Sequence, residues 1–140
     1  MPEKDGRDGV LLPITSATAA FLATLLLITA VMTVRQRLKH KVAFGDAGEQ
    51  SLIAASRSHG NLAEHAPIVI ILLGLLEYAG ANSILIASVA GAFCFGRVMH
   101  VVGLHQDSVP GKAPFTRQLG VILTWLTILV LVVLVVLGLM

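Results

Sequence analysis

Four apolar stretches, each long enough to cross a membrane, fill most of this 140-residue chain, and two of them carry charged side chains. Charged residues make up only 13% of the chain, against roughly 25% in soluble domains, which indicates an integral membrane protein. An ionisable side chain at the bilayer centre costs at least about 2.5–3.5 kcal/mol. We therefore expect the charges within the second and third stretches to be compensated by each other, by a ligand or by water, and to mark the functional site.

The pattern predicts an all-α integral membrane protein, with a single four-transmembrane-helix bundle as its one domain over residues 1–140. Asp46 followed by Glu49 fits a capping box at the start of the second helix. Pro67 should kink that helix, and Asn82 or Ser83 should cap the third. The four helices are expected at about residues 10–38, 47–77, 83–104 and 117–139.

Lysine and arginine are concentrated in two of the connections. The residues after the first span include four of them, in the run Arg35–Lys41, and the connection before the fourth span holds Lys112 and Arg117. Because cytoplasmic loops carry an excess of these residues, both connections should be cytoplasmic and both termini should be outside. Every charge embedded in the spans except Glu77 then lies at the cytoplasmic end.

Polar residues follow one face of each of the two central helices. Arg57, Asn61 and Glu64 are spaced i, i+4, i+7, and Arg97 and His100 are spaced i, i+3. Two polar faces at matching depth indicate a pocket between helices. Arginine suits carboxylates, and a carboxylate suits an amino group, so the pattern favours a small, polar, multiply anionic ligand with a backbone-like part.

Simpler interpretations remain open for several of these residues. Glu64 could pair with an arginine only to hold helices together, and His59 and His65 could face water in a loop. The basic run Arg35–Lys41 could contact anionic lipid, and Glu77 could be an interfacial charge. No zinc-site spacing of His or Cys occurs, the single Cys94 fits a packing role, and a net charge of +2 does not indicate nucleic acid binding.

The motifs together resemble those of the MAPEG family, the membrane-associated proteins in eicosanoid and glutathione metabolism, and are most similar to its bacterial members. The resemblance covers roughly Val34 to Gln118 and the four-span layout. The residues that carry it are Val34-Arg35, Gly45-Asp46-x-Gly48, Arg57-x-His59-x-Asn61-x-x-Glu64-x-x-Pro67 and Gly96-Arg97-Val98-x-His100.

The resemblance implies a homotrimer of the bacterial inner membrane that binds glutathione at its cytoplasmic end, between neighbouring subunits. It implies a glutathione transferase that conjugates glutathione to a lipophilic electrophile entering from the bilayer, with reduction of lipid hydroperoxides as a further activity. By the same resemblance Arg117 would be catalytic. The glutathione-binding residues would be Arg35, Arg57, Asn61, Glu64, Arg97 and His100.

Three positions depart from the family pattern. Leu104 stands where many members have a tyrosine, Gln118 where prostaglandin-forming members have a serine, and Gly60 where the eicosanoid enzymes have an arginine. These changes argue against prostaglandin or leukotriene synthesis and keep open a non-catalytic, lipid- or glutathione-binding scaffold of the same fold. A small multidrug exporter would need an acidic residue in the first span, and Val10–Val34 has none.

Overall fold

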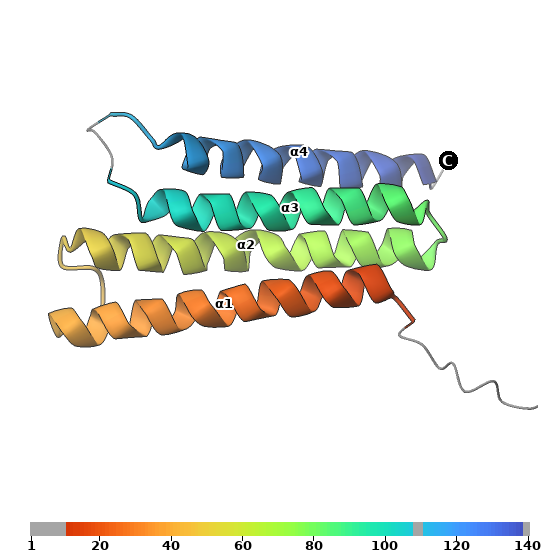
Figure 1. Cartoon of the computed structure of the whole chain (residues 1–140). Coiled ribbons are helices and arrows are strands. Elements are labelled where there is room, and N and C mark those ends of the chain that lie inside the picture. The colour runs from red at the N-terminus through yellow and green to blue at the C-terminus, as the bar shows by residue number, and fades with distance from the viewer. Residues whose placement is uncertain (1–10, 108–110, 139–140) are drawn as a thin grey trace, which may run out of the picture.

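The computed structural model describes residues 11–107 and 111–138, and they form an antiparallel bundle of four helices (Figure 1). Each helix is long and apolar enough to cross a membrane. The fold predicted from the sequence, an all-α transmembrane four-helix bundle, is therefore confirmed. The helices are α1 (Pro13–His40), α2 (Gln50–Tyr78), α3 (Ser83–Leu104) and α4 (Phe115–Gly138).

The helices lie side by side in chain order, with α2 and α3 in the middle (Figure 1). α1 packs against α2 and α3, and α4 packs against α3 and α2, whereas the described parts of α1 and α4 do not touch. Because the direction alternates, the α1–α2 and α3–α4 connections lie at one end of the bundle and the α2–α3 connection at the other (Figure 1). The start of α4 is thereby placed beside the first turns of α2.

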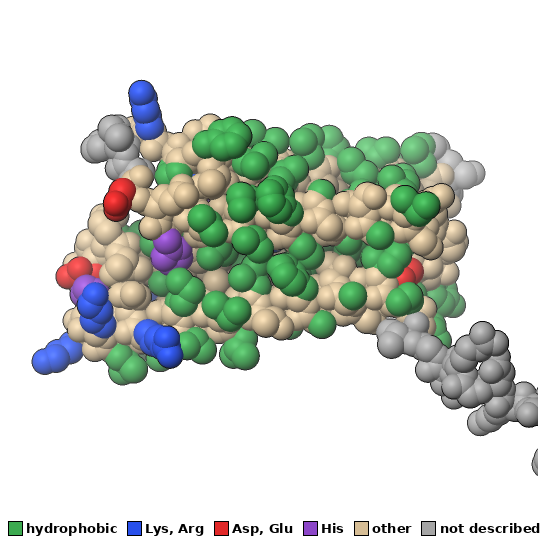
Figure 2. Space-filling view, in the orientation of Figure 1, with side chains coloured by type: hydrophobic (Ala, Val, Ile, Leu, Met, Phe, Trp, Pro, Cys, Tyr) green, Lys and Arg blue, Asp and Glu red, His purple; other side chains and the backbone are tan. Residues whose placement is uncertain are grey.

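Apolar side chains form both the core and most of the outer surface. Leu62, Val69 and Leu73 of α2 are fully buried against Phe93 of α3. On the outside, large apolar side chains such as Trp125, 66% exposed, cover the helices, as they do over much of the face in Figure 2. In the apolar 18-residue segment of each helix, at most 39% of the residues are buried within one chain. Most of each span is therefore left to contact lipid or other chains.

The start of α2 differs from the sequence prediction. A helix from residue 47 with a capping box at Asp46 and Glu49 is wrong, because Ala47 and Gly48 have φ angles of 51° and 77°, in the left-handed region. The Asp46 carboxylate instead accepts a hydrogen bond from the Gly48 amide at 3.0 Å, and α2 begins at Gln50. At α3 the predicted cap is confirmed, since Asn82 accepts from the Leu85 amide at 3.0 Å.

The other ends differ by a few residues. α1 begins at Pro13 and continues to His40, beyond the expected residue 38, and α4 begins at Phe115 and not at 117. Val10 and Leu139, the outer limits expected for the first and last helices, lie outside the described residues. α3 has the expected range, and α2 continues through Pro67, so the kink there stays a prediction.

Glu77 has a structural role that the sequence interpretation as an interfacial charge missed. The first turn of a helix leaves backbone N–H groups without partners, and Leu12, which precedes α1, supplies no side-chain cap. Glu77 of α2 accepts hydrogen bonds from the amides of Ile14 at 2.9 Å and Thr15 at 2.8 Å. Its carboxylate therefore caps α1 from the neighbouring helix, where negative charge is favoured.

Candidate functional site

The Lys and Arg side chains that Figure 2 shows gather at the end of the bundle that carries the α1–α2 and α3–α4 connections. This is the end that the distribution of lysine and arginine predicts to be cytoplasmic. The side of the membrane on which this end lies stays a prediction.

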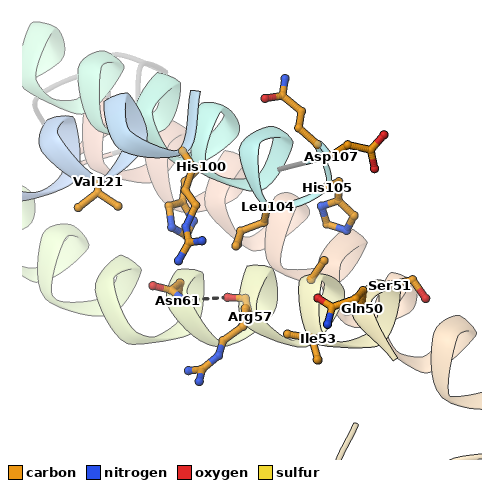
Figure 3. Close-up of a pocket in the computed structure, with 13 residues that line it drawn as sticks. Gln50, Ser51, Ile53, Arg57, Asn61, His100, Leu104, His105, Asp107 and Val121 are labelled. Carbon is orange, nitrogen blue, oxygen red and sulfur yellow. Dashed lines mark hydrogen bonds between the residues drawn. The ribbon is translucent and has the colours of Figure 1, made fainter. Parts of the chain in front are cut away.

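A pocket of about 980 Å³ opens at this end between α2, α3, the start of α4 and the chain that follows α3 (Figure 3). Ligand pockets are commonly about 300–1,000 Å³, so a small peptide-sized molecule fits. Its lining residues are Gln50, Ser51, Ile53, Ala54, Arg57, Asn61, His100, Leu104, His105, Gln106, Asp107, Arg117 and Val121.

Four of the seven predicted site residues line this pocket: Arg57, Asn61, His100 and Arg117. His100 and Leu104 project from α3 toward α2, where the Asn61 amide donates to the Arg57 carbonyl oxygen at 3.0 Å (Figure 3). The Arg57 guanidinium projects away from His100 in the same view. Side chains from three helices therefore line one cavity, among them the Asn61 amide and the Arg117 guanidinium, which suits an anionic ligand.

Glycines bring His100 and Arg117 together by letting α3 and α4 approach closely. A Cβ at Gly103 would clash with the backbone nitrogen of Arg117. A Cβ at Gly120 would lie 2.6 Å from the His100 amide nitrogen, closer than real Cβ atoms come to a backbone atom. The two backbones touch where larger residues would separate them, and this fixes the start of α4 beside the pocket.

Arg97 does not line the pocket. Its side chain is 1% exposed, and its Nη1 donates to the Thr124 hydroxyl of α4 at 3.3 Å. Its Nε and Nη2 have no hydrogen-bond partner among the described residues. The resemblance grouped Arg97 with the ligand contacts, but within one chain it lies in the seam between α3 and α4, one turn before His100.

Glu64 and Arg35 also lie outside the pocket, and both are exposed. Across residues 11–107 and 111–138, only the ion pair of His40 with Glu49, at 3.3 Å, falls within 4.0 Å. No ion pair within 4.0 Å joins Glu64 to Arg57 or Arg97 in this part of the chain, and the alternative in which Glu64 holds helices together stays a prediction. Its carboxylate is left available at the surface.

The interpretation of His59 and His65 as facing loop water is wrong. His59 Nδ1 lies 3.3 Å from the Thr29 hydroxyl of α1, so this residue joins two helices inside the apolar region. His65 Nδ1 donates to the Asn61 carbonyl oxygen at 2.7 Å, one turn earlier on α2. Neither ring lines the pocket.

Several pocket residues were missed from the sequence. Gln50 lies seven positions before Arg57 and thus on the same helix face, a signal that extending the face by two turns would have found. Ser51 is held in the wall by the Gln36 side chain of α1, to which its hydroxyl donates at 3.1 Å. His105 and Asp107 follow α3, and no periodicity marks them.

A second, smaller pocket of about 390 Å³ adjoins the first and is lined by Ala113, Arg117, Gln118, Val121 and Ile122. Arg117 and Val121 line both cavities. Gln118 donates to the Ala113 carbonyl oxygen at 2.7 Å and so fastens the connection to the start of α4. The structure thus gives Gln118 a structural contact at the position where prostaglandin-forming members carry a serine.

No group of three or more His, Cys, Asp or Glu side chains in the described part of the chain is placed to hold a metal ion. The single Cys94 is a half-buried free thiol of α3 and lines neither pocket. The chemistry that the site can supply therefore comes from arginine, histidine, amide and hydroxyl groups and from the Asp107 carboxylate.

Comparison with known proteins agrees with this architecture. The chain matches the family model of the MAPEG family over residues 15–137. It belongs to the MAPEG family. Two curated relatives, both named inner membrane protein YecN, come from Escherichia coli strain K12 and from strain O6:H1. Each is 35% identical over 118 residues, which cover 84% of this chain and 86% of the relative.

No solved structure matches the chain. The four apolar helices and the inner-membrane relatives support a multi-pass inner membrane protein of the MAPEG family. The names of the relatives specify no activity, so the chemistry of this chain has to be argued from its site.

Proposed function

We propose that this protein is a membrane-bound glutathione transferase that conjugates glutathione to lipophilic electrophiles. The observation that carries the proposal is the convergence of Arg57, Asn61, His100 and Arg117 on one pocket of about 980 Å³. Glutathione bears two carboxylates, one amino group and a thiol. Cationic side chains can bind its carboxylates, and Asn61 can pair with a peptide group.

Arg117 is the proposed catalytic residue. The thiolate, and not the thiol, is the nucleophile, and a free thiol with a pKa of about 8.5 is mostly protonated at neutral pH. A guanidinium beside the sulfur favours the anion by opposite charge. The thiol proton leaves to water, the thiolate forms a bond to the electrophilic carbon, and the leaving group departs with the electron pair of the broken bond.

The smaller pocket supports a lipophilic second substrate. It shares Arg117 with the polar pocket, and its wall includes Ile122, which is 52% exposed on the outer surface of α4. An apolar molecule can reach such a surface from the bilayer without crossing water. Arg117 would then act between a glutathione arriving from the cytoplasm and a substrate arriving from the lipid, and the same arrangement would serve for lipid hydroperoxides.

The proposed assembly is a homotrimer with both termini in the periplasm and the pocket facing the cytoplasm. Arg35 and Glu64 lie on the surface of one chain, outside its pocket. In a trimer such residues can complete the site of a neighbouring subunit, where Glu64 would receive the amino group of glutathione and Arg35 a carboxylate. Native mass spectrometry tests the trimer, and reporter fusions after Gly45 and Gly80 test the orientation.

One observation favours a non-catalytic, glutathione- or lipid-binding member of the family. Leu104, which lines the pocket, presents an apolar side chain at the spacing where many members have a tyrosine hydroxyl. A pocket without that hydroxyl can bind an anion but has one donor fewer for the sulfur. Under this alternative the chain binds glutathione and does not convert it.

A paired measurement on purified protein tests the proposal. Calorimetry should give saturable glutathione binding that weakens in Asn61→Ala, and conjugation of a generic aryl halide should be enzyme-dependent. Lys112→Gln is the matched control, because Lys112 is exposed at the same end but lines neither pocket. Binding without conjugation would favour the scaffold alternative, and absence of binding would reject both.

A further inference from the structure

Thr124 of α4 holds the buried guanidinium of Arg97 in a defined direction. Thr124 is 1% exposed, and its hydroxyl donates to the Gly120 carbonyl oxygen at 2.8 Å. Because a hydroxyl has one proton, its lone pair is what faces Arg97, whose Nη1 donates at 3.3 Å. This is the one hydrogen bond of the Arg97 side chain within the described residues.

The Arg97 charge lies directly behind the pocket wall. His100 follows Arg97 by one turn on the same helix face, is 3% exposed and lines the pocket. Arg117 of α4 lines the same pocket as His100. The close approach of Gly96 and Gly120 keeps α3 against α4 at this level, so Arg97 lies between the two helices.

We propose that Thr124 is a positioning residue, which fixes the Arg97 charge behind His100 so that this charge stabilises the bound thiolate without touching the ligand. The inference rests on the proposed glutathione transferase function and adds a residue to it. A charge that is fixed in advance and shielded from water stabilises a developing anion without reorganisation. Released from Thr124, the guanidinium would sample other directions, and its effect at the sulfur would weaken.

The other titratable groups around the pocket do not replace the contribution of the Arg97 charge to the stability of the bound thiolate. From α2, Arg57 lines the pocket, whereas Glu64 and His65 lie outside it. From α4, Arg117 lines the pocket, and α1 carries no charged residue between Pro13 and Val34. Beyond α3, His105 and Asp107 line the outer part of the pocket. Glu64 and Asp107 are the only carboxylates among these groups. The electrostatic potential in the pocket beside His100 therefore depends on where each cation is held.

Thr124→Val tests the inference, because valine keeps the shape of threonine and removes the acceptor. Thr127→Val is the matched control. Thr127 is 5% exposed, and within the described residues its hydroxyl bonds only to carbonyl oxygens of its own helix, Leu123 at 2.8 Å and Thr124 at 2.9 Å. The measurement is the thiolate absorbance of the glutathione-saturated protein against pH, in detergent.

Thr124→Val should raise the apparent pKa of the bound thiol by about half a unit, so the thiolate fraction at pH 7 falls about threefold. Thr127→Val should titrate as the parent does, and Thr124→Ser, which restores a hydroxyl, should recover most of the shift. Affinity for S-methyl glutathione, which has no thiol to ionise, should change less than about twofold in all three variants.

Identical titrations of Thr124→Val and the parent would overturn the inference, as would an equal shift in Thr127→Val. A loss of S-methyl glutathione affinity as large as the loss of thiolate would also overturn it, because that outcome indicates general damage to the pocket. If Thr124→Val and Thr124→Ala both fail to fold, the residue is structural and the inference is wrong. A parent that binds no glutathione would reject the proposed function itself, which distinguishes the two failures.

Discussion

The two helix pairs on either side of the bundle are held together in different ways. α1 and α2 are joined by polar side chains along their whole length: Glu77 at one end, Thr29 with His59 in the middle, and Gln36 with Ser51 at the other end. α3 and α4 are joined mainly by the close contact of their backbones at Gly103 and Gly120. Arg97 with Thr124 is the one side-chain hydrogen bond between α3 and α4 in the described part of the chain.

The difference shows how the chain builds a polar pocket in an apolar environment. Hydrogen bonds in a low-dielectric region fix the register of two helices without requiring close contact. Backbone contact through glycine fixes the distance between α3 and α4. The site needs this fixed distance because His100 comes from α3 and Arg117 from α4. We therefore expect the α3–α4 pair to respond most to added volume and the α1–α2 pair to lost hydrogen bonds.

The largest effect should follow from Gly103→Ala, which adds one methyl group to the α3–α4 contact. The new Cβ would clash with the backbone nitrogen of Arg117, and backbone cannot move aside as a side chain can. The unfolding free energy should fall by about 3 kcal/mol, the upper part of the range for overpacking. Denaturant titration of the detergent-solubilised protein measures this, and conjugation of an aryl halide should slow as Arg117 is displaced.

Gly91→Ala is the matched control for that experiment, since Gly91 is an exposed residue of the same helix with no atom within 4 Å of an added Cβ. Alanine favours a helix over glycine by up to about 1 kcal/mol, so this variant should be as stable as the parent or slightly more. If Gly103→Ala matched Gly91→Ala in stability, backbone contact would not be what holds α3 against α4.

A smaller effect is expected from Glu77→Ala on the other pair. Two backbone amides, of Ile14 and Thr15, would lose a charged acceptor, at a cost of about 2 kcal/mol. Because Glu77 lies at the end of the bundle opposite the pocket, glutathione affinity should not change. The measurement is the same denaturant titration with calorimetry beside it. A loss of glutathione binding free energy as large as the loss of unfolding free energy would mean that the two ends of the bundle are coupled. It would contradict the view that Glu77 supports the fold and not the pocket.

Glu64→Gln should leave stability unchanged and weaken glutathione binding about tenfold, by removing the charge that receives the amino group. Glu64 is exposed and forms no ion pair within 4.0 Å among the described residues. A glutathione analogue without the amino group should bind parent and variant alike. If Glu64→Gln destabilised the protein and left affinity intact, the interhelical interpretation would apply in the assembled protein.

Helical periodicity predicted one wall of the pocket correctly. Arg57 and Asn61 line it because residues three or four apart share a helix face, whatever the rest of the chain does. Glu64 lies on the same face, one turn further along, but the pocket ends before it. How far the pocket extends along this face of α2 depends on how α3 packs against α4. Gly103 and Gly120 determine that packing, and helical periodicity does not show it.

Contacts between residues far apart in the chain could not be predicted. Glu77 caps α1 across 63 positions, and nothing in the sequence near either residue marks the pair. The capping box failed for a local reason, since the left-handed backbone at Ala47 and Gly48 cannot continue into a helix. Arg97 was grouped with the ligand contacts by resemblance, and only the structure shows that it is buried and bonds to Thr124.

The most direct test of the account is the thiolate absorbance of the glutathione complex against pH in the parent and in Arg117→Ala. The account predicts that the variant keeps most of its glutathione affinity, because Arg57, Asn61 and His100 remain. The apparent pKa of its bound thiol should rise by about one unit, which lowers the thiolate fraction at pH 7 several-fold, and turnover should fall in step. Identical titration curves with unchanged turnover on an aryl halide would contradict the account and remove Arg117 from the mechanism.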